Sequence, residues 1–352
     1  MRILLVRLRE IGDVVFTTPA IHALRDAYPS AQLTYVVEPH AAAVVRHNPH
    51  LDRVVVAPRR RGGIRGLADD IALGRSLRRE QFDLAIDFHG GPRASLLTWL
   101  SGARESIGYE IAGRGWMYTR RVARPRALRP RHSVENQWDL LAALGIRSAD
   151  RAAYPVEMPI EPAAAAAVES RLAGAGVAAD DRIVVIHVSA GNPFRRWPLE
   201  YFIELTTGIA HQRRARVVIT SGPSEHEAAA RVVAGARSRL PPPSAEGVLG
   251  CGEFSLAELR ALAERAALFI GGDSGPLHIA ATSRVPIVAL YGPTLPERSA
   301  PWRDDAIPVV SIEPAPLPCR PCNQRRCLPG DFRCLTSIDA RRVLDAAIKC
   351  LR

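Results

Sequence analysis

The sequence predicts an α/β protein of two doubly wound, Rossmann-like domains, on three observations. Its 352 residues, of which 47% are hydrophobic, are enough for two domains of ordinary size. Short segments rich in Val, Ile and Leu alternate with helical stretches, which is typical of parallel sheets built from strand-helix-strand units. This scheme occurs twice, on either side of the proline-rich segment Gly145–Pro162. We therefore expect an N-terminal domain over residues 1–155 and a C-terminal domain over residues 156–352.

The first half of the chain holds four expected strands and four expected helices. The strands are short runs of β-branched and other apolar residues, and the helices are the longer stretches between them. The strands are expected at Arg2–Leu8, Gln32–Val37, Arg53–Ala57 and Leu84–Asp87, and the helices at Val14–Ala27, Leu67–Glu80, Arg93–Leu100 and Val134–Leu144.

The second half repeats the pattern, and a proline opens three of its four expected helices. The fourth starts with a capping box, in which Ser255 is followed three residues later by Glu258. Strands are expected at Arg182–His187, Arg216–Thr220, Leu268–Ile270 and Pro286–Leu290, and helices at Pro162–Ala173, Pro198–His211, Pro223–Ala236 and Ser255–Glu264. Two such domains enclose a cleft and bind ligands at the carboxyl ends of their strands, so the turns after strands are the candidate sites.

The charge is strongly positive and comes from arginine. The formal net charge is +11, and Lys349 is the only lysine in the sequence. Arginines cluster at Arg59–Arg65 and Arg120–Arg131, where Gly and Pro favour exposed loops. Such loops suit anionic partners, namely nucleic acid, phospholipid headgroups or a phosphorylated substrate, although an arginine-rich solvated surface explains them equally well. Aromatic residues make up 6% and do not interleave with the arginines, which disfavours stacking on single-stranded nucleic acid.

Targeting signals are not recognisable in the sequence. No run approaches the roughly 20 apolar residues of a membrane span, and Met1–Val6 begins a strand pattern and not a signal peptide. We therefore expect a cytoplasmic location.

The turn after the first strand offers an acid at the start of a helix. A dinucleotide site would need the pattern G-x-G-x-x-G here, and the turn has only Gly12. Asp13 follows at the expected helix N-terminus, where the macrodipole stabilises a carboxylate. Asp13 is either a plain N-cap or a general base at the mouth of the expected cleft.

Two turns of the second half offer groups that suit an anion. The turn His187–Pro198 holds Ser189, Asn192, Arg195 and Arg196, with no acidic neighbour in sequence to neutralise the two arginines. A solvated basic loop is the plainer interpretation of this turn.

The second of these turns is "FIGGDSGPLHIAAT", which runs from Phe269 to Thr282. The backbone N–H groups of Ser274 and Gly275, at a helix N-terminus, suit a phosphate. Pro276 fits the first helical position. His278, one turn into the helix, is placed to donate to the same anion. Asp273 would repel an anion, so we expect it to hold the loop or to contact a ligand hydroxyl.

Several other chemistries are excluded by their missing motifs. The sequence has no G-x-x-x-x-G-K-[ST], no G-x-S-x-G elbow, no H-E-x-x-H and no D-x-D pair. Without a carboxylate pair for Mg²⁺ or Mn²⁺, arginines and a helix terminus would have to neutralise the charge of a leaving group.

Together these motifs resemble glycosyltransferase family 9, the bacterial ADP-heptose:lipopolysaccharide heptosyltransferases. The similar segments are "IGDVVFTTPAIHAL" near the start, "RHSVENQWDLLAALGI" at Arg131–Ile146, "NPFRRWP" in the middle, and "GGDSGPLHIAA" with "VALYGPT" after it. They span nearly the whole chain in order and spacing.

The resemblance implies a GT-B fold, with the acceptor bound mainly by the first domain and the ADP-sugar mainly by the second. It implies inverting, metal-independent transfer with Asp13 as the catalytic base. Ser274, Gly275 and His278 match the diphosphate loop, and Asp273 matches an acid that contacts the donor. Arg195 or Arg196 stands where the family often has a lysine beside the diphosphate, and Ser189 and Asn192 lie in the same turn.

The arginine loops then acquire an expected partner. The resemblance implies an inner-core lipopolysaccharide acceptor, which bears phosphates and carboxylates at the membrane surface. Arg60, Arg61, Arg120 and Arg121 are the candidate acceptor-binding residues. We expect peripheral association with the inner face of the inner membrane and no specific binding of nucleic acid.

Four cysteines near the end, Cys319, Cys322, Cys327 and Cys334, lie within sixteen residues. They suit either a structural zinc or iron-sulfur site or a packing role that ties the last crossing of the chain to the core. We favour the packing role and expect no cofactor in catalysis.

Two other functions stay open. One is a family relative with another nucleotide sugar or acceptor. The other is a noncatalytic nucleotide-sugar-binding protein, which would keep the phosphate loop without needing Asp13.

Overall fold

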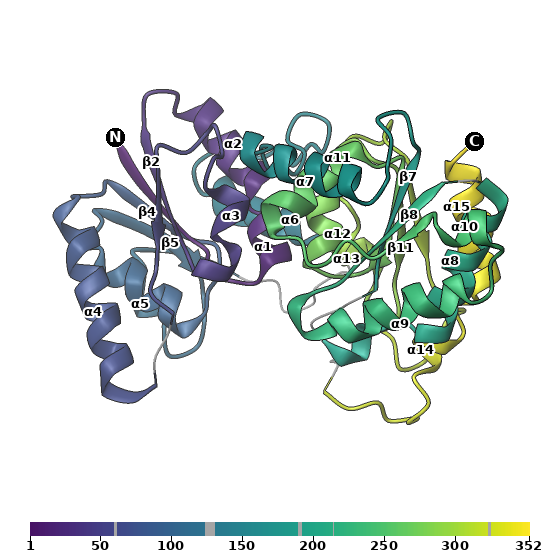
Figure 1. The fold of residues 1–352 in the computed structure, drawn as a ribbon. Coiled ribbons are helices and arrows are strands. Elements are labelled where there is room, and N and C mark those ends of the chain that lie inside the picture. Colours follow the sequence, from purple (N-terminus) through teal and green to yellow (C-terminus); the bar gives the residue numbers. More distant parts are fainter. Residues whose placement is uncertain (60–61, 124–130, 189–191, 214, 323–324) are drawn as a thin grey trace. The chain divides into compact units, whose positions relative to one another are not determined.

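The chain is an α/β protein of two compact units, Met1–Pro159 and Ile160–Arg352, in a computed structural model. The structure describes residues 1–59, 62–123, 131–188, 192–213, 215–322 and 325–352. The junction after Pro159 lies inside the proline-rich segment of the sequence. Each unit has its own parallel six-stranded sheet (Figure 1).

The first unit is built on a sheet with the strand order β3-β2-β1-β4-β5-β6. All its strand pairs are parallel, as the sequence predicts. Its strands are β1 (Arg2–Val6), β2 (Gln32–Val37), β3 (Arg53–Val56), β4 (Leu84–Asp87), β5 (Glu105–Tyr109) and β6 (Arg120–Val122); its helices are α1 (Ile11–Val15), α2 (Thr18–Ala27), η1 (Pro39–Ala41), α3 (Ala42–Val45), α4 (Gly63–Arg79), α5 (Pro92–Leu100), η2 (Gly115–Met117) and α6 (Ser133–Ala142).

One expected helix of this unit is in fact two. The prediction of a single helix over Val14–Ala27 is wrong, because the chain forms α1 and then restarts as α2. Pro19 has no N–H to donate and its ring would crowd the carbonyl of Val15, so one helix cannot run through this point. The hydroxyl of Thr18 donates to the Val15 carbonyl at 2.8 Å and satisfies the end of α1.

The second unit repeats the architecture with the strand order β12-β11-β10-β7-β8-β9, again all parallel. The capping box of Ser255 and Glu258 is confirmed at the start of α11. The strands are β7 (Ile183–His187), β8 (Arg216–Thr220), β9 (Val248–Leu249), β10 (Leu268–Gly272), β11 (Ile287–Leu290) and β12 (Val309–Ile312); the helices are α7 (Pro162–Gly174), η3 (Pro193–Arg195), α8 (Leu199–Arg213), η4 (Pro223–Glu225), α9 (His226–Arg237), α10 (Pro242–Ala245), α11 (Leu256–Arg265), α12 (Gly275–Ala280), α13 (Pro296–Ser299), α14 (Arg333–Thr336) and α15 (Ala340–Cys350).

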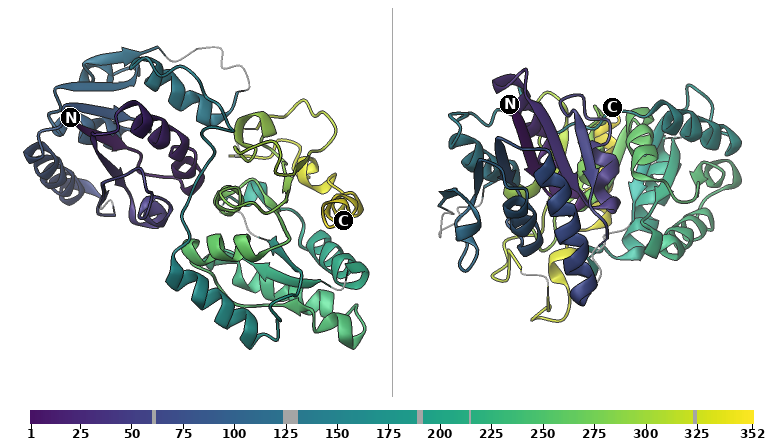
Figure 2. Two further views of the ribbon diagram at one scale, coloured as in Figure 1. Left: turned by 90° about the horizontal axis from the view of Figure 1, so that it is seen from above. Right: turned by 90° about the vertical axis from the view of Figure 1, so that its left-hand side faces the viewer.

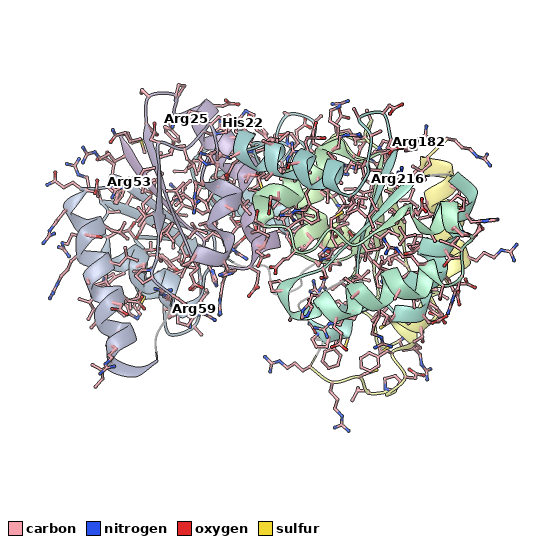
Figure 3. The ribbon with its side chains drawn as sticks, in the orientation of Figure 1. His22, Arg25, Arg53, Arg59, Arg182 and Arg216 are labelled. Atoms are coloured by element: carbon pink, nitrogen blue, oxygen red, sulfur yellow. The ribbon has the colours of Figure 1, made fainter. Side chains whose placement is uncertain are left out.

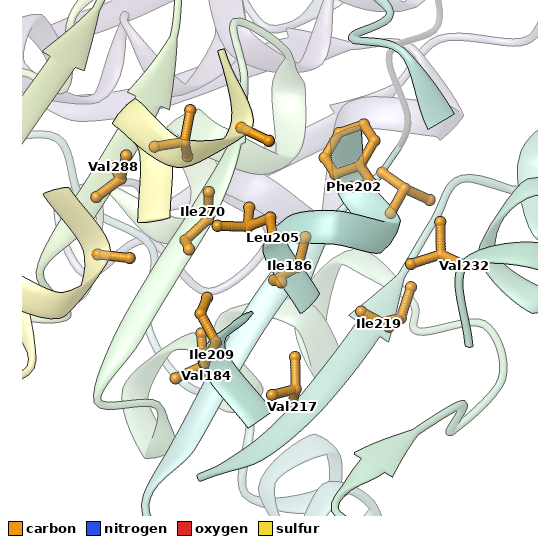
Figure 4. Close-up of a cluster of buried hydrophobic side chains, with 14 of the residues drawn as sticks. Val184, Ile186, Phe202, Leu205, Ile209, Val217, Ile219, Val232, Ile270 and Val288 are labelled. Carbon is orange, nitrogen blue, oxygen red and sulfur yellow. The ribbon is translucent and has the colours of Figure 1, made fainter. Parts of the chain in front are cut away.

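Apolar strand faces supply the cores. In the second unit, side chains of β7, β8, β10 and β11 pack against those of α8 and α9 (Figure 4). The C-terminal helix α15, yellow in Figure 2, packs beside α8 and adds to this core. In the first unit, residues of β1 and β4 pack against α5. Burial of such side chains is worth roughly 25 cal/mol per Å² of apolar surface and is the main stabilising term of each unit.

No helix in the described part of the chain is both long and apolar enough to cross a membrane.

Candidate active site

A cavity of about 670 Å³ opens at the carboxyl edge of the first sheet. Its walls come from the turns after β1, β2, β3 and β4. Since the strand order reverses between β1 and β4, the cavity lies at the topological switch point, where doubly wound sheets bind their ligands. The lining residues are Leu8, Arg9, Glu10, Glu38, Pro39, His40, Arg59, His89, Gly91, Pro92, Arg93 and Ala94.

Asp13 lies next to this cavity on α1, three residues after Glu10. It is the acidic residue of the first helical turn, and Glu10 is the N-cap, so Asp13 is not a plain N-cap. Its carboxylate forms an ion pair with the guanidinium of Arg7 and is 40% exposed. Arg7 is itself held, because it donates to the carbonyl oxygens of Phe88 at 2.6 Å and Arg9 at 3.1 Å. Asp13 is therefore both oriented by a fixed cation and open to an incoming group.

Arg93 braces the opposite wall of the cavity. Its Nε donates to Asp70 at 2.7 Å, and its two other nitrogens donate to Glu38 at 2.7 Å and to the Pro58 carbonyl at 2.8 Å. The side chain is 6% exposed, so these bonds replace the water that a buried cation would otherwise need. Arg93 thus holds the turns after β2 and β3 together.

His89 and Asp87 shape the turn after β4. The carboxylate of Asp87 is buried and accepts hydrogen bonds from the N–H groups of His89 and Gly90, both at 2.8 Å, and from Tyr118 at 2.6 Å. Burial raises the pKa of Asp87 in spite of these bonds. Burial, together with the charges of Arg7 and Arg9, lowers the pKa of His89 to about 4. His89 is therefore a neutral imidazole at pH 7, able to donate and accept hydrogen bonds at the cavity wall.

The structure locates half of the predicted acceptor-binding arginines. Arg60 and Arg61 lie outside the described residues. Arg120 and Arg121 do not lie in a loop as expected. They form the exposed edge strand β6, where Arg120 approaches Glu105 at 3.4 Å, and neither is among the residues that line the cavity.

In the second unit, Asp273 is the centre of the predicted phosphate loop. It follows β10, is 3% exposed, and lies 3.3 Å from His278 Nε2 and 3.2 Å from Arg195. Burial alone would raise the pKa of Asp273, but the hydrogen bond and charge of His278 and the charge of Arg195 lower it to about 2. Asp273 therefore holds the loop through the side chains of His278 and Arg195, and its expected contact to a ligand hydroxyl stays a prediction.

The rest of this loop presents polar groups to its surroundings. Ser274 is the N-cap of α12, but its side chain makes no capping bond, and its hydroxyl is buried without a hydrogen-bond partner among the described residues. The helix starts at Gly275, so Pro276 is its second residue and not its first. Gly271 and Gly272 belong to β10, where an added Cβ would crowd Phe269 and the Arg195 carbonyl. The close approach of Phe269 accounts for Gly271.

The two arginines of the turn after β7 have different partners. Arg195 donates a hydrogen bond to the Asp273 carbonyl at 2.9 Å, so its side chain contacts the loop after β10. Arg196 pairs with Glu225 at 2.5 Å, beside the turn after β8. Each arginine is paired with an acid that is distant in sequence, which a search for acidic neighbours in the sequence could not find. Asn192 caps η3 by accepting from the Phe194 N–H at 3.0 Å, and Ser189 lies outside the described residues.

The cysteine-rich segment is fastened to the turn after β11. The Cys322 N–H donates to the Pro293 carbonyl at 3.0 Å, and Arg320 donates to the Thr294 carbonyl at 2.7 Å and to Glu313 at 2.8 Å. None of the six cysteines forms a disulfide bond within the described part of the chain. Burial is the largest cause that raises the pKa of the Cys334 thiol, and the charges of Cys319, Cys327 and Cys322 raise it further. Among the described residues, no three of these cysteines have sulfur atoms within 4.8 Å of one another.

Sequence reasoning missed Arg7, Glu38, His89 and Arg93. Arg7 and Glu38 each lie just after a strand, and this position in the sequence could have identified them as candidate site residues. His89 follows β4 in the same way. Only the fold shows that the turns after these strands form one cavity.

Comparison with known proteins identifies the family of the chain. The profile of glycosyltransferase family 9 (heptosyltransferase) matches residues 71–329. Lipopolysaccharide heptosyltransferase 3 of Escherichia coli is 27% identical over 311 residues, 88% of each chain. The glycosyl transferase family 9 structure from Veillonella parvula superposes with a TM-score of 0.83 at 24% identity, over 99% of this chain and 97% of that one.

A more distant structure is also similar in fold. The iron-containing dodecameric glycosyltransferase TibC of enterotoxigenic Escherichia coli has a TM-score of 0.57 at 14% identity, over 99% of this chain and 78% of that one. These likenesses confirm the GT-B class of fold expected from the sequence. The family match confirms that the chain is an enzyme of the glycosyltransferase class. The chain belongs to glycosyltransferase family 9, the heptosyltransferase family.

Proposed function

We propose that this chain is an inverting, metal-independent glycosyltransferase that moves a heptose from ADP-heptose to a hydroxyl of an inner-core lipopolysaccharide. The family match and the curated lipopolysaccharide heptosyltransferase support the sugar and the class of acceptor. In this proposal the first unit binds the acceptor and the second binds the donor. The observation that carries it is the Asp13 carboxylate, oriented by Arg7 and exposed beside a cavity at the switch point of its sheet.

The proposed reaction is a single displacement. Asp13 accepts the proton of the acceptor hydroxyl while that oxygen attacks the anomeric carbon of the heptose. The bond between the anomeric carbon and the diphosphate oxygen breaks, and ADP leaves with the electron pair. Because the nucleophile enters opposite the leaving group, the anomeric configuration inverts.

The leaving diphosphate needs positive charge and hydrogen-bond donors in place of a metal ion. We assign these to Ser274, Gly275, His278 and Arg195, which the Asp273 cluster holds together. The unpartnered hydroxyl of Ser274 supports this assignment. Arg195 is preferred to Arg196, because Arg195 contacts Asp273 in the loop after β10, whereas Arg196 pairs with Glu225 beside another strand. Ser189 and Asn192 are assigned to the same donor site.

The cavity of the first unit suits an anionic glycolipid. Arg9, Arg59 and Arg93 line it, and Glu10 and Glu38 offer acceptors to sugar hydroxyls. Arg60, Arg61, Arg120 and Arg121 remain proposed contacts to acceptor phosphates or to anionic lipid. We place the enzyme in the cytoplasm, bound peripherally to the inner face of the inner membrane, with no specific nucleic-acid partner. Binding to liposomes should then require anionic lipid and weaken with salt.

The cysteine-rich segment is proposed to be structural. Its hydrogen bonds to the turn after β11 support a packing role for Cys319, Cys322, Cys327 and Cys334. A structural metal at these cysteines is the alternative, and metal analysis of the purified protein decides between the two.

The proposed function is tested with a product assay. The purified chain is incubated with ADP-heptose and a set of truncated core glycolipids, with and without a chelator. We expect one glycolipid to gain a heptose of inverted anomeric configuration at the same rate in both conditions. A retained configuration or a loss of rate with the chelator would contradict the mechanism. Transfer from another nucleotide sugar alone would instead identify a family relative with a different donor.

A further inference from the structure

Two histidines and a glutamate of the first unit gather away from the cavity. His22 belongs to α2, His50 follows α3, and Glu157 lies near the end of the unit. One ligand atom from each lies within 4.8 Å of the other two. His50 Nε2 is 3.3 Å from Glu157 Oε1, and the two imidazole rings stack with centroids 4.0 Å apart and 15° between their planes. Among the described residues this is the one group of three with such spacing.

The distances suit a tetrahedral metal ion. Bonds of about 2.0–2.2 Å to nitrogen and oxygen put neighbouring ligands of Zn²⁺ about 3.3–3.5 Å apart. The His50 and Glu157 atoms already have this separation. The His22 ring must turn out of its stacked position on His50 to bring a nitrogen to the same point. Solvent can supply the fourth ligand, since the three side chains are 19–27% exposed.

Neighbouring residues fix two of the ligands before any ion arrives. Asn48, which is buried, donates to Glu157 Oε1 at 3.1 Å and accepts from the His50 N–H at 2.9 Å. Arg25 donates to the His50 carbonyl at 3.0 and 3.2 Å. The Glu157 N–H donates to the Thr18 hydroxyl at 2.9 Å. The backbone and side chain at this corner are thus already arranged, which reduces the entropy lost on binding an ion.

The charge of the group also favours a cation. Glu157 contributes a carboxylate, and Asp26 approaches His22 Nε2 at 3.9 Å. The nearest guanidinium, Arg25, is engaged with Asp52 at 2.6 Å and with the His50 carbonyl. His22 Nδ1 is buried with no hydrogen-bond partner among the described residues.

From this arrangement we infer that His22, His50 and Glu157 bind one divalent transition-metal ion, with Zn²⁺ as the best match to two imidazoles and a carboxylate. The ion would tie α2 and the loop after α3 to the segment that ends the first unit. This goes beyond the proposed transfer reaction, which does not use the site.

The site lies at the other end of the sheet from the cavity. His50 precedes the first residue of β3 by three positions, whereas Arg59, which lines the cavity, follows β3. In Figure 3, Arg53 and Arg59 mark the two ends of β3, and His22 and Arg25 lie toward the Arg53 end. The ion is therefore structural, and its removal should lower the melting temperature and leave the transfer step unchanged.

Zinc titration of the full-length protein tests the inference. The chain is stripped of metal and its cysteines are alkylated, so that Cys319, Cys322, Cys327 and Cys334 cannot bind zinc. Calorimetry should then find one Zn²⁺ per chain. His50→Gln and Glu157→Gln should each weaken binding by at least about 10- to 100-fold. His47→Gln, an exposed histidine on the same loop, is the matched control and should bind like the parent.

Two further measurements distinguish loss of a ligand from loss of the fold. Circular dichroism of the metal-free variants checks folding, and Glu157→Gln preserves the size of the side chain and its bond from Asn48. Crystals grown with zinc should show an anomalous peak between His22, His50 and Glu157. The inference is overturned if the parent binds no zinc, if both variants keep the parental affinity, or if the peak lies elsewhere. A simple ion pair of His50 and Glu157 would leave the melting temperature insensitive to zinc, which also overturns it. Failure of the transfer assay does not affect this test.

Discussion

Replacing Asp273 by asparagine tests how the donor loop is held. The change keeps the size of the side chain and removes its charge between His278 and Arg195. A carboxyl whose pKa falls from 3.8 to about 2 gains roughly 2 kcal/mol of stability from its ionised form. Asp273 is 3% exposed, so solvent screens this interaction little. We therefore expect Asp273→Asn to lower the free energy of unfolding by about 2 kcal/mol at pH 7.

The stabilisation by Asp273 should depend on pH. The pKa of Asp273 is lower in the folded state, so its contribution is complete above pH 3.8 and is lost as pH falls toward 2. Urea denaturation of parent and variant at several pH values should show their difference shrink over that range. A double-mutant cycle with Arg195→Gln should give a coupling energy of about 0.5–3 kcal/mol.

A second assay connects this stability to function. Calorimetric titration with ADP should show weaker binding for Asp273→Asn, because Ser274 and Arg195 lose their fixed positions. If the variant were as stable as the parent at pH 7 and bound ADP equally well, Asp273 would not organise the loop. The reasoning on the donor site would then be refuted.

Three other changes test separate parts of the account. Arg7→Gln removes the cation that orients Asp13 and should lower kcat roughly a hundredfold in steady-state kinetics, while the affinity for ADP in a titration stays unchanged. An unaltered kcat would show that Arg7 does not position the base. Gly108→Ala places a methyl group less than 3.0 Å from the ring of Tyr118, so the free energy of unfolding measured with urea should fall by about 1–3 kcal/mol. The control Gly174→Ala, which has open space around it, should leave this free energy unchanged. Burial lowers the pKa of His187 to about 4 in the folded state, against 6.5 in the unfolded state. Because the unfolded state binds more protons between these pH values, the free energy of unfolding of the parent should fall by about 3 kcal/mol from pH 6.5 to pH 4. His187→Gln should lack that part of the fall, and an identical pH profile would disprove the assignment.

The sequence predicts the sheets well because buried parallel strands leave a strong pattern. β2, β4 and β8 lie where their apolar runs predict them. Four strands are missed, namely β5, β6, β9 and β12. The edge strand β6 is missed because Arg120 and Arg121 are exposed and carry no apolar pattern. The break between α1 and α2 could have been found from Pro19, since proline disfavours the interior of a helix.

The candidate site is predictable only in part. Asp13 and Asp273 follow strands, and their positions in sequence indicate functional turns. The partners of these acids are harder to predict from the sequence. Arg195 and Asp273 are 78 residues apart in sequence and meet only because β7 and β10 are neighbours in the sheet. The group of His22, His50 and Glu157 has no local motif at all, because it comes from three segments that fold onto one another.

Asp13→Asn provides the most direct test of the central claim, that a carboxylate of the first unit activates the acceptor hydroxyl. The account predicts that transfer from ADP-heptose falls by about 10²- to 10⁴-fold in single-turnover measurements, while ADP binding and the melting temperature stay close to those of the parent. Transfer at the parental rate by a correctly folded Asp13→Asn protein would contradict it.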